Sequence, residues 1–317
     1  MYNAEQKEKF IHAYTTKLSR RESCVLTFNA LEEYEVQWGA DFCTRTTEEI
    51  LPVLEKITGL RVRSRWTRVT ILKSYVKWCL DVGVDGAKDD MLDVAHTHLG
   101  LEKVRTQTVP NPKALQQYLD TICVPEHLQT TDNLLRCYYW LSYAGIPEDD
   151  IMTIRCKDVD IVKRIIHYKG NKIAPIYNEA VAAFKNCVEL DSFRYIHPNY
   201  TKDVWRPRTD GISLIRGVRE TTTISSIRSD LSHRAKAHQD ETPFRLSTSR
   251  VWMSGVFYRT YQDKQNGIRP DFERLVLEQM EGKTYKLDSG RNTIDAKKRQ
   301  LMRDYENDYE QWELVWY

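Results

Sequence analysis

Basic side chains cluster near the start of one predicted helix. Residues 61–77, RVRSRWTRVTILKSYVK, contain no acid and six basic residues: Arg61, Arg63, Arg65, Arg68, Lys73 and Lys77. The pattern predicts that a helix begins here with Ser64 as its N-cap. Because a helix start presents free N–H groups and a positive dipole, arginines at this point suit phosphate oxygens. We interpret them as phosphate ligands; the alternative is a solvated basic face.

A second basic zone lies further along the chain. Residues 202–250 hold ten Lys or Arg against six Asp or Glu, whereas Asp304 to Tyr317 holds five acids and no base. On a chain of net charge +2, two separated basic zones favour a polyanion gripped at two places, and double-stranded DNA is the expected partner. The candidate contacts in this zone are Arg206, Arg208, Arg245 and Arg250, and Lys169 and Lys172 are candidates before it.

The remaining reactive side chains argue against metal or redox chemistry. The seven cysteines are scattered without a CxxC pair, which is typical of reduced thiols. His96 and His98 have no Cys, Asp or Glu at ligand spacing, so no metal and no cofactor is expected. The polar start and the lack of a long apolar run predict neither signal peptide nor membrane span. We therefore expect a cytoplasmic, nucleoid-associated protein of a bacterial host.

Three regions must position these side chains. Residues 1–84 are predicted to be helices only, with a Thr46/Glu49 capping box and a helix end at Gly39. Residues 85–112 lose periodicity and are predicted to be a linker, and 113–317 form the second domain. The fourth helix is expected to bury one stripe, made of Trp66, Val69, Leu72, Val76, Cys79 and Leu80.

Residues 161–168 and 173–176 are β-branched runs joined around Gly170-Asn171, which predicts a β-hairpin. Helical patterns surround it on both sides. The predicted fold class is therefore mainly α with a small β-hairpin or sheet (α+β).

This order of parts resembles the tyrosine recombinases, or phage integrase family, over most of the chain. The stretch AGIPEDDIMTIRCKDVDI, residues 144–161, matches the family's Gly-Leu-Arg segment, short helix and turn into a strand. Pro147 stands where the family has its first catalytic arginine. The resemblance implies a two-domain DNA clamp, with residues 1–84 as the core-binding domain and 113–317 as the catalytic fold.

Two further motifs carry the resemblance. In YKGNKIAPI, residues 168–176, Lys169 matches the lysine that serves the family as general acid. In TPFRLSTSRVWMSGVFYR, residues 242–259, Phe244 replaces the catalytic histidine and Ser247 replaces the second catalytic arginine. The former nucleophile position is assigned to Tyr305 by its helical context, with Tyr285 as the alternative; either is also compatible with an ordinary packing tyrosine.

The missing residues predict that the scaffold no longer cuts DNA. Each lost cation at the scissile phosphate costs roughly 10²–10³ in rate, whereas DNA binding is spread over many contacts. The resemblance thus predicts a sequence-specific repressor of the phage or mobile-element type. The alternatives are a divergent active integrase and an accessory architectural protein of a recombination complex.

The chain ends in EQWELVWY, whose large apolar side chains include Trp312, Leu314 and Trp316. Such side chains need a partner. Self-association through this tail is one prediction, because family tails pack onto a neighbouring subunit; folding back onto the same chain is the other.

Overall fold

The chain forms two compact units. A computed structural model describes residues 1–95, 99–123, 131–189, 192–195, 204–207, 213–215, 223–280 and 294–317. The first unit contains Met1–Val104 and Arg299–Gln311, and the second contains Arg105–Lys298 and Trp312–Tyr317. Each unit has its own hydrophobic core. None of the helices in these ranges combines the length and the hydropathy that a bilayer crossing requires.

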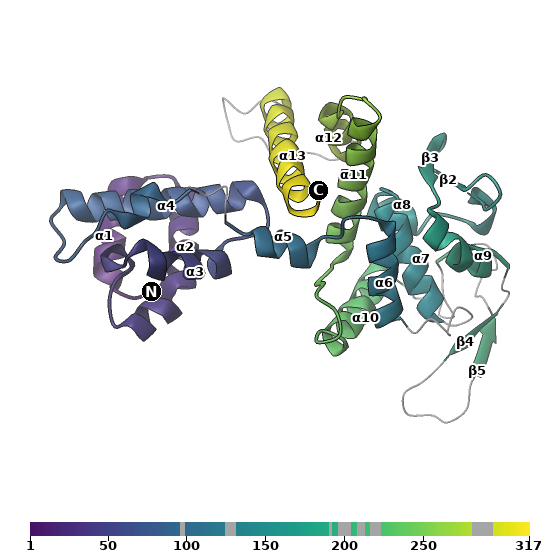
Figure 1. Cartoon of the computed structure of the whole chain (residues 1–317), viewed down its shortest axis with the longest axis horizontal. Helices are drawn as coiled ribbons and strands as arrows, with labels where there is room; N and C mark the ends of the chain where they lie inside the picture. Colours follow the sequence, from purple (N-terminus) through teal and green to yellow (C-terminus); the bar gives the residue numbers. More distant parts are fainter. Residues whose placement is uncertain are drawn as a thin grey trace. The chain divides into compact units, whose positions relative to one another are not determined.

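The first unit is a small helical domain (Figure 1). Its helices are α1 (Ala4–Tyr14), α2 (Leu18–Trp38), α3 (Thr47–Ile57) and α4 (Val62–Asp81), with the 3-10 turns η1 (Phe42–Thr44) and η2 (Asp90–Asp93). Helix α4 packs against α1 and α2, and α3 packs against α2. Helix α5 (Leu101–Gln107) follows, and the boundary between the units falls within it.

Local sequence signals set the helix ends in this unit. The predicted capping box of Thr46 and Glu49 is present at the start of α3. Gly39 ends α2 with φ 62°, a left-handed conformation that glycine adopts at little cost. The predicted start of α4 is wrong, because Arg61 rather than Ser64 is its N-cap. The predicted linker is also more ordered than expected, since it contains η2 and α5.

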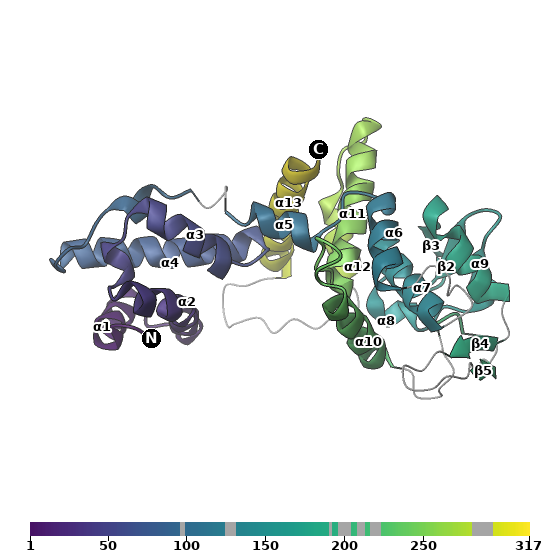
Figure 2. The same ribbon diagram turned by 60° about the horizontal axis from the view of Figure 1, so that its bottom comes forward.

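The second unit is mostly helical and contains two small sheets (Figures 1 and 2). Its α-helices are α6 (Pro112–Ile122), α7 (Thr131–Tyr143), α8 (Glu148–Ile151), α9 (Val181–Glu189), α10 (Ile224–Ala237), α11 (Thr248–Gln265) and α12 (Phe272–Met280). Helix α7 is central, because it packs against α11, α9 and α8. Helix α13 (Ile294–Trp316) contributes residues to both units.

The predicted hairpin belongs to a three-stranded antiparallel sheet of β1 (Val159–Asp160), β2 (Ile165–Tyr168) and β3 (Lys172–Pro175). Tyr168 pairs with Lys172, so the turn consists of residues 169–171. Residues 161–164 form a turn rather than the start of the strand, and Val162 is exposed there. The predicted mainly α fold with a small sheet is confirmed.

A second pair of strands was not predicted. β4 (Ser192–Tyr195) and β5 (Val204–Pro207) form a two-stranded antiparallel sheet. Their register pairs Arg194 with Trp205 and Phe193 with Arg206. Each run has only four residues, which is too short for a clear alternating pattern.

Helices α7 and α11 approach so closely that only glycine fits between them. A Cβ atom added to Gly255 would lie 1.8 Å from the carbonyl oxygen of Tyr143. The same oxygen accepts a hydrogen bond from Arg259 Nη1 at 2.7 Å, and the carbonyl of Gly145 accepts one from Trp252 Nε1 at 3.2 Å. Helix α11 therefore fixes the segment that leads into Pro147.

The last residues of the chain pack within the second unit. Trp312 is fully buried and its indole N–H donates to the carbonyl of Val109 at 3.2 Å. Trp316 donates to Thr108 Oγ1 at 3.0 Å. Of the three tail side chains proposed for self-association, Leu314 is the exposed one. Trp312 and Trp316 therefore pack onto their own chain, and self-association through the tail stays a prediction.

Helix α10 is held to α7 by a bidentate ion pair. Arg234 Nη1 and Nη2 donate to the two carboxylate oxygens of Asp132 at 2.8 and 2.7 Å, and Asp132 is buried. We expect Arg234→Ala to lower the free energy of unfolding by about 2 kcal/mol, because it leaves a buried carboxylate without its partner.

Urea unfolding followed by circular dichroism measures this change. The control is Arg228→Ala, which removes a bidentate arginine with a side chain 55% exposed and should cost less than about 1 kcal/mol. If the two variants lost the same free energy of unfolding, burial of the Asp132 carboxylate would not be the cause of the destabilisation.

Candidate nucleic-acid interface

The start of α4 and one face of α2 enclose a basic cavity of about 390 Å³ in the first unit. We call it the arginine cavity. Its lining consists of Ser23, Leu26 and Thr27 from α2, Arg61, Arg63, Ser64, Thr67 and Arg68 at the start of α4, and Asp304. Residues 61, 64 and 68 recur at helical spacing, which brings them to one face. The three guanidinium groups supply N–H donors suited to phosphate oxygens, whereas the hydroxyls of Ser23, Thr27 and Thr67 already donate to backbone carbonyls of their own helices.

Two of the three arginines in this cavity are paired with carboxylates. Arg61 Nε lies 2.9 Å from Asp308 Oδ2, and Arg63 Nη1 lies 3.1 Å from Asp304 Oδ2. Burial raises the pKa of Asp308, and the nearby Arg61 opposes that rise.

Arg68 differs from its two neighbours. No carboxylate lies within ion-pair distance of it in the described ranges, and burial lowers the pKa of its guanidinium. A phosphate group in the cavity would supply the missing countercharge.

The structure corrects the prediction for Arg65. Its side chain is fully buried, donates from Nη1 to the carbonyl of Leu99, and lies against Gly100. Burial lowers its pKa, with Asp308 and Glu55 acting in the opposite direction. Arg65 is therefore part of the interior of the unit and does not present its charge to DNA.

The helical periodicity of α4 contained the signal for this correction. Val62, Arg65, Val69, Leu72, Val76 and Cys79 recur at spacings of three and four, and all six are buried. The predicted stripe used Trp66 and Leu80 instead, and both are exposed. Lys73, half-buried, donates from Nζ to the carbonyl of Leu92 at 2.6 Å.

The second unit contains a pocket of about 470 Å³ at the position of the recombinase-like motifs. Pro147 and Lys169, predicted from separate motifs, both line it, as does Lys172. The lining also contains Arg228, Tyr168 and Trp252. Four carboxylates surround these groups and were not anticipated: Glu148, Asp149, Asp150 and Glu278. Three cations against four carboxylates make a poor phosphate site.

Pro147 has a structural role in this pocket. It is the N-cap of α8, and its carbonyl accepts hydrogen bonds from the backbone N–H groups of Asp150 and Ile151 at 2.9 and 3.1 Å. The adjacent Glu148 binds Arg228 through both carboxylate oxygens and also accepts from the hydroxyl of Tyr138. Arg228, the one arginine among the described residues that line the pocket, is therefore already neutralised.

Lys169 lies in the turn of the β2–β3 hairpin. Its φ is 42° and that of Gly170 is 78°, so two successive residues are left-handed. This conformation is uncommon for lysine and costs on the order of 1 kcal/mol. Asparagine adopts this left-handed conformation more readily than lysine. The strained backbone at Lys169 therefore indicates that the lysine side chain itself has a role at this position.

The third motif does not place its key residues in the pocket. Phe244 is half-buried and its ring packs against Tyr118 and Trp316 at centroid distances of 6.3 Å. Ser247 is the exposed N-cap of α11, whereas its neighbours Thr248 and Ser249 line the pocket. In the structure Phe244 is therefore a packing residue and Ser247 a helix cap.

The other predicted basic residues are more dispersed. Arg245 is exposed, and its Nη1 donates to the carbonyls of Thr242 and Phe244 at 2.7 and 3.1 Å. Arg250 lies half-buried in the first turn of α11. Arg206 is in β5, where the backbone alone is described. His96, His98, Arg208 and Tyr285 lie outside the described residues.

Tyr305 is a buried residue of the first unit. It is 5% exposed, and the guanidinium of Arg61 lies over its ring at 5.3 Å from the centroid. Tyr305 is therefore a packing residue that supports Arg61 in the arginine cavity.

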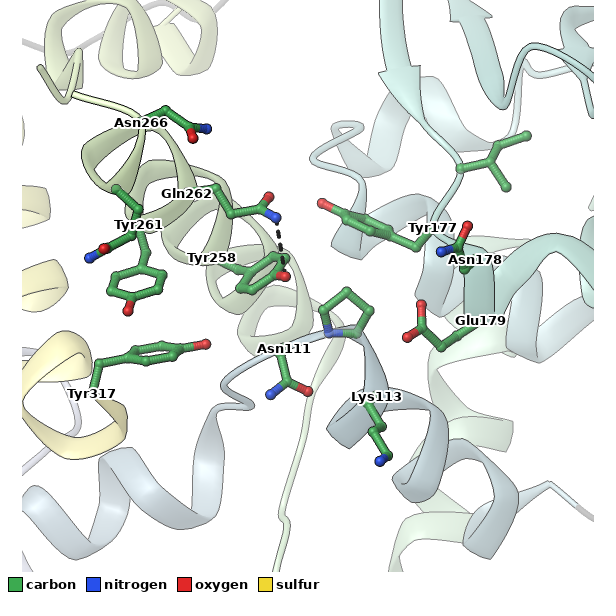
Figure 3. A pocket seen from close by; sticks show the side chains of 13 residues that line it. Asn111, Lys113, Tyr177, Asn178, Glu179, Tyr258, Tyr261, Gln262, Asn266 and Tyr317 are labelled. Atoms are coloured by element: carbon green, nitrogen blue, oxygen red, sulfur yellow. Dashed lines mark hydrogen bonds between the residues drawn. The ribbon is translucent and has the colours of Figure 1, made fainter. Parts of the chain in front are cut away.

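A larger cavity of about 740 Å³ in the second unit has a different character (Figure 3). Tyr177, Tyr258, Tyr261 and Tyr317 line it together with amide side chains such as Gln262 and Asn266. Among the described residues that line it, Lys113 is the one cation and Glu179 the one anion. This near-neutral aromatic lining does not suit a phosphate backbone, which leaves the arginine cavity as the better nucleic-acid site. Within the described ranges, the structure contains no group of three or more His, Cys, Asp or Glu side chains that could hold a metal ion.

A comparison with protein-family models finds a match within the first unit. Residues 1–81 match the family model described as MrpR, N-terminal core-binding domain. The match covers nearly all of residues 1–84, the predicted first region of the chain. A search of curated proteins finds no significant match.

Two solved structures resemble the chain along most of its length. One is the integrase from mycobacterium phage Brujita, with a TM-score of 0.34, 14% sequence identity and coverage of 98% of this chain and 96% of that chain. The other is the XerA recombinase, with a TM-score of 0.35, 12% identity and coverage of 97% and 98% respectively.

Proposed function

We propose that this protein binds specific sites on duplex DNA and represses transcription, using a recombinase-like scaffold that no longer cuts DNA. The arginine cavity is the observation that carries the proposal. It gathers Arg61, Arg63 and Arg68 at the start of a long helix. The match of residues 1–81 to a core-binding domain supports the same unit as the DNA-binding part.

The composition of the second pocket supports the loss of catalysis. A phosphoryl-transfer site needs uncompensated cations around the scissile phosphate. Here Pro147 caps a helix, Arg228 is engaged by Glu148, and three more carboxylates line the wall. Such a pocket opposes the charge that develops in strand cleavage. A divergent active integrase, the first alternative, would have to overcome this repulsion.

Repression is the simplest use of a DNA-binding scaffold without cleavage, because occupancy of a site near a promoter is sufficient. The sequence motifs resemble those of the SPβ-type prophage master repressor, which belongs to this inactive-scaffold class. An architectural protein of a recombination complex, the second alternative, would bind with less dependence on sequence.

Footprinting on DNA fragments from the same genome tests the proposal. We expect a small number of protected sites that lie at promoters and are bound with a strong dependence on salt. Protection that is indifferent to sequence would reject the repressor and favour the architectural alternative.

A conservative substitution separates binding from catalysis. We expect Tyr305→Phe to change DNA affinity by less than about threefold, because the aromatic packing under Arg61 is retained. The protected sites and reporter repression should also be unchanged. The control is Tyr305→Ala, which removes the packing and should weaken binding by destabilising the first unit. Loss of repression by the Phe variant without loss of folding would favour a nucleophilic tyrosine.

A further inference from the structure

Part of α13 packs against the arginine cavity. Residues Arg299–Gln311 belong to the first unit although they lie close to the end of the chain. Asp304, Tyr305 and Asp308 contact the start of α4, and their spacing places them on one face of α13.

The two aspartates make the contacts that a phosphate backbone would make. Asp308 pairs with Arg61 and also accepts a hydrogen bond from the backbone N–H of Val62 at 2.9 Å. An anion at the first N–H groups of a helix is the arrangement in which helices bind phosphate. Asp304 pairs with Arg63 at the rim of the cavity. Two of the three arginines thus have carboxylate partners that DNA would have to replace.

We propose that the α13 segment Arg299–Gln311 is an autoinhibitory element that competes with DNA for the arginine cavity. This inference rests on the proposed DNA-binding function and assigns a regulation to the same site. In the competition, phosphate groups displace Asp304 from Arg63 and Asp308 from Arg61, and α13 moves away from the start of α4.

The strength of these contacts suits a reversible competitor. The Arg63–Asp304 pair is partly exposed, with side chains 50% and 18% accessible, and such pairs contribute less than about 1 kcal/mol. The Asp308 contacts are stronger, because Asp308 is buried and accepts a backbone N–H as well. DNA that engages several cations at once can overcome both, whereas a single anion cannot.

The test compares Asp304→Asn with Glu306→Gln in the full chain. Both variants remove one negative charge from the same helix, but Glu306 is exposed and has no arginine partner in the described residues. The probe is a mixed-sequence duplex about three helical turns long. We expect Asp304→Asn to bind it about threefold to fivefold more tightly than wild type, and Glu306→Gln less than twofold.

The salt dependence and a double-mutant cycle identify the cause. Releasing Arg63 should steepen the plot of log affinity against log salt by about 0.9, the value for one more phosphate contact. In an Arg63→Ala background, Asp304→Asn should give no more gain than Glu306→Gln, because the released arginine is absent.

Hydrogen exchange of the wild-type protein follows the displacement itself. Addition of the duplex should increase amide exchange in residues 299–311 and leave α1 unchanged. Increased or unchanged protection of 299–311 would overturn autoinhibition, because α13 would then stay in place or support the bound state.

The outcomes distinguish the two levels of the account. If wild type binds and the two carboxylate variants behave alike, autoinhibition is wrong and the DNA-binding function stands. If only Asp304→Asn binds, both stand. If neither the wild type nor Asp304→Asn binds the duplex at low salt, both the autoinhibition and the DNA-binding function are wrong.

Discussion

Replacing Arg63 and Arg68 together with alanine should weaken DNA binding by roughly 10-fold to 100-fold, because each lost charge-assisted contact costs on the order of 1 kcal/mol. Both side chains line the arginine cavity, and Arg68 has no carboxylate partner among the described residues. The slope of log affinity against log salt should become shallower by about 1.8, the value for two phosphate contacts. Fluorescence anisotropy with a labelled duplex over a series of salt concentrations measures both quantities.

The matched control is Lys9→Ala combined with Lys88→Ala. These exposed lysines belong to the same unit and lie outside the arginine cavity, so the control removes the same net charge. It should lower affinity only slightly and leave the slope nearly unchanged. Equal effects of the two double variants would mean that the cavity acts only through the overall charge of the unit.

Gly255→Ala should destabilise the second unit by on the order of 3–5 kcal/mol, because overpacking of two helix backbones leaves no flexible group to move aside. The added Cβ would meet the carbonyl oxygen and carbon of Tyr143 at 1.8 and 2.6 Å. Without this contact, replacing glycine by alanine in a helix would stabilise the protein by up to about 1 kcal/mol. The sign of the change in unfolding free energy therefore already tests the contact. Urea unfolding of the full chain gives the change.

Gly267→Ala provides the comparison. Gly267 has φ 75°, and nothing lies within 4 Å of an added Cβ, so its cost is backbone strain alone, about 1 kcal/mol. If Gly255→Ala were tolerated as well as this control, α7 and α11 would not be in backbone contact. The segment leading to Pro147 would then be less firmly fixed than the hydrogen bonds from Trp252 and Arg259 indicate.

Short-range signals in the sequence were sufficient for much of the fold. The capping box at Thr46, the glycine end at Gly39 and the hairpin around Gly170 are local features, and each is present. The error at α4 concerned single positions: the predicted stripe contained Trp66 where the buried residue is Arg65, whereas Val69, Leu72, Val76 and Cys79 were predicted correctly. A basic residue in an apolar stripe is easily assigned to the surface, because its burial depends on distant groups such as the carbonyl of Leu99.

The candidate site was predictable in part. Pro147 and Lys169, which two separate motifs single out, line one pocket, and both lie in segments with strong turn signals. Glu278 and Arg228 were not predicted, since they come from helices far away in the sequence, whereas Glu148, Asp149 and Asp150 directly follow Pro147 and were missed although they lie in the same motif. The pairing of Asp304 and Asp308 with the start of α4 spans about 240 residues of chain and has no local signature.

A single assay tests the central claim that the protein binds DNA without cutting it. The protein is mixed with labelled duplexes from its own genome, intact or carrying a nick, and each sample is run on a native gel and on a denaturing gel. We predict a shifted band for selected fragments on the native gel and no protein–DNA band on the denaturing gel. A band that survives denaturation and disappears in a Tyr305→Phe or Tyr285→Phe variant would show covalent catalysis and contradict the account.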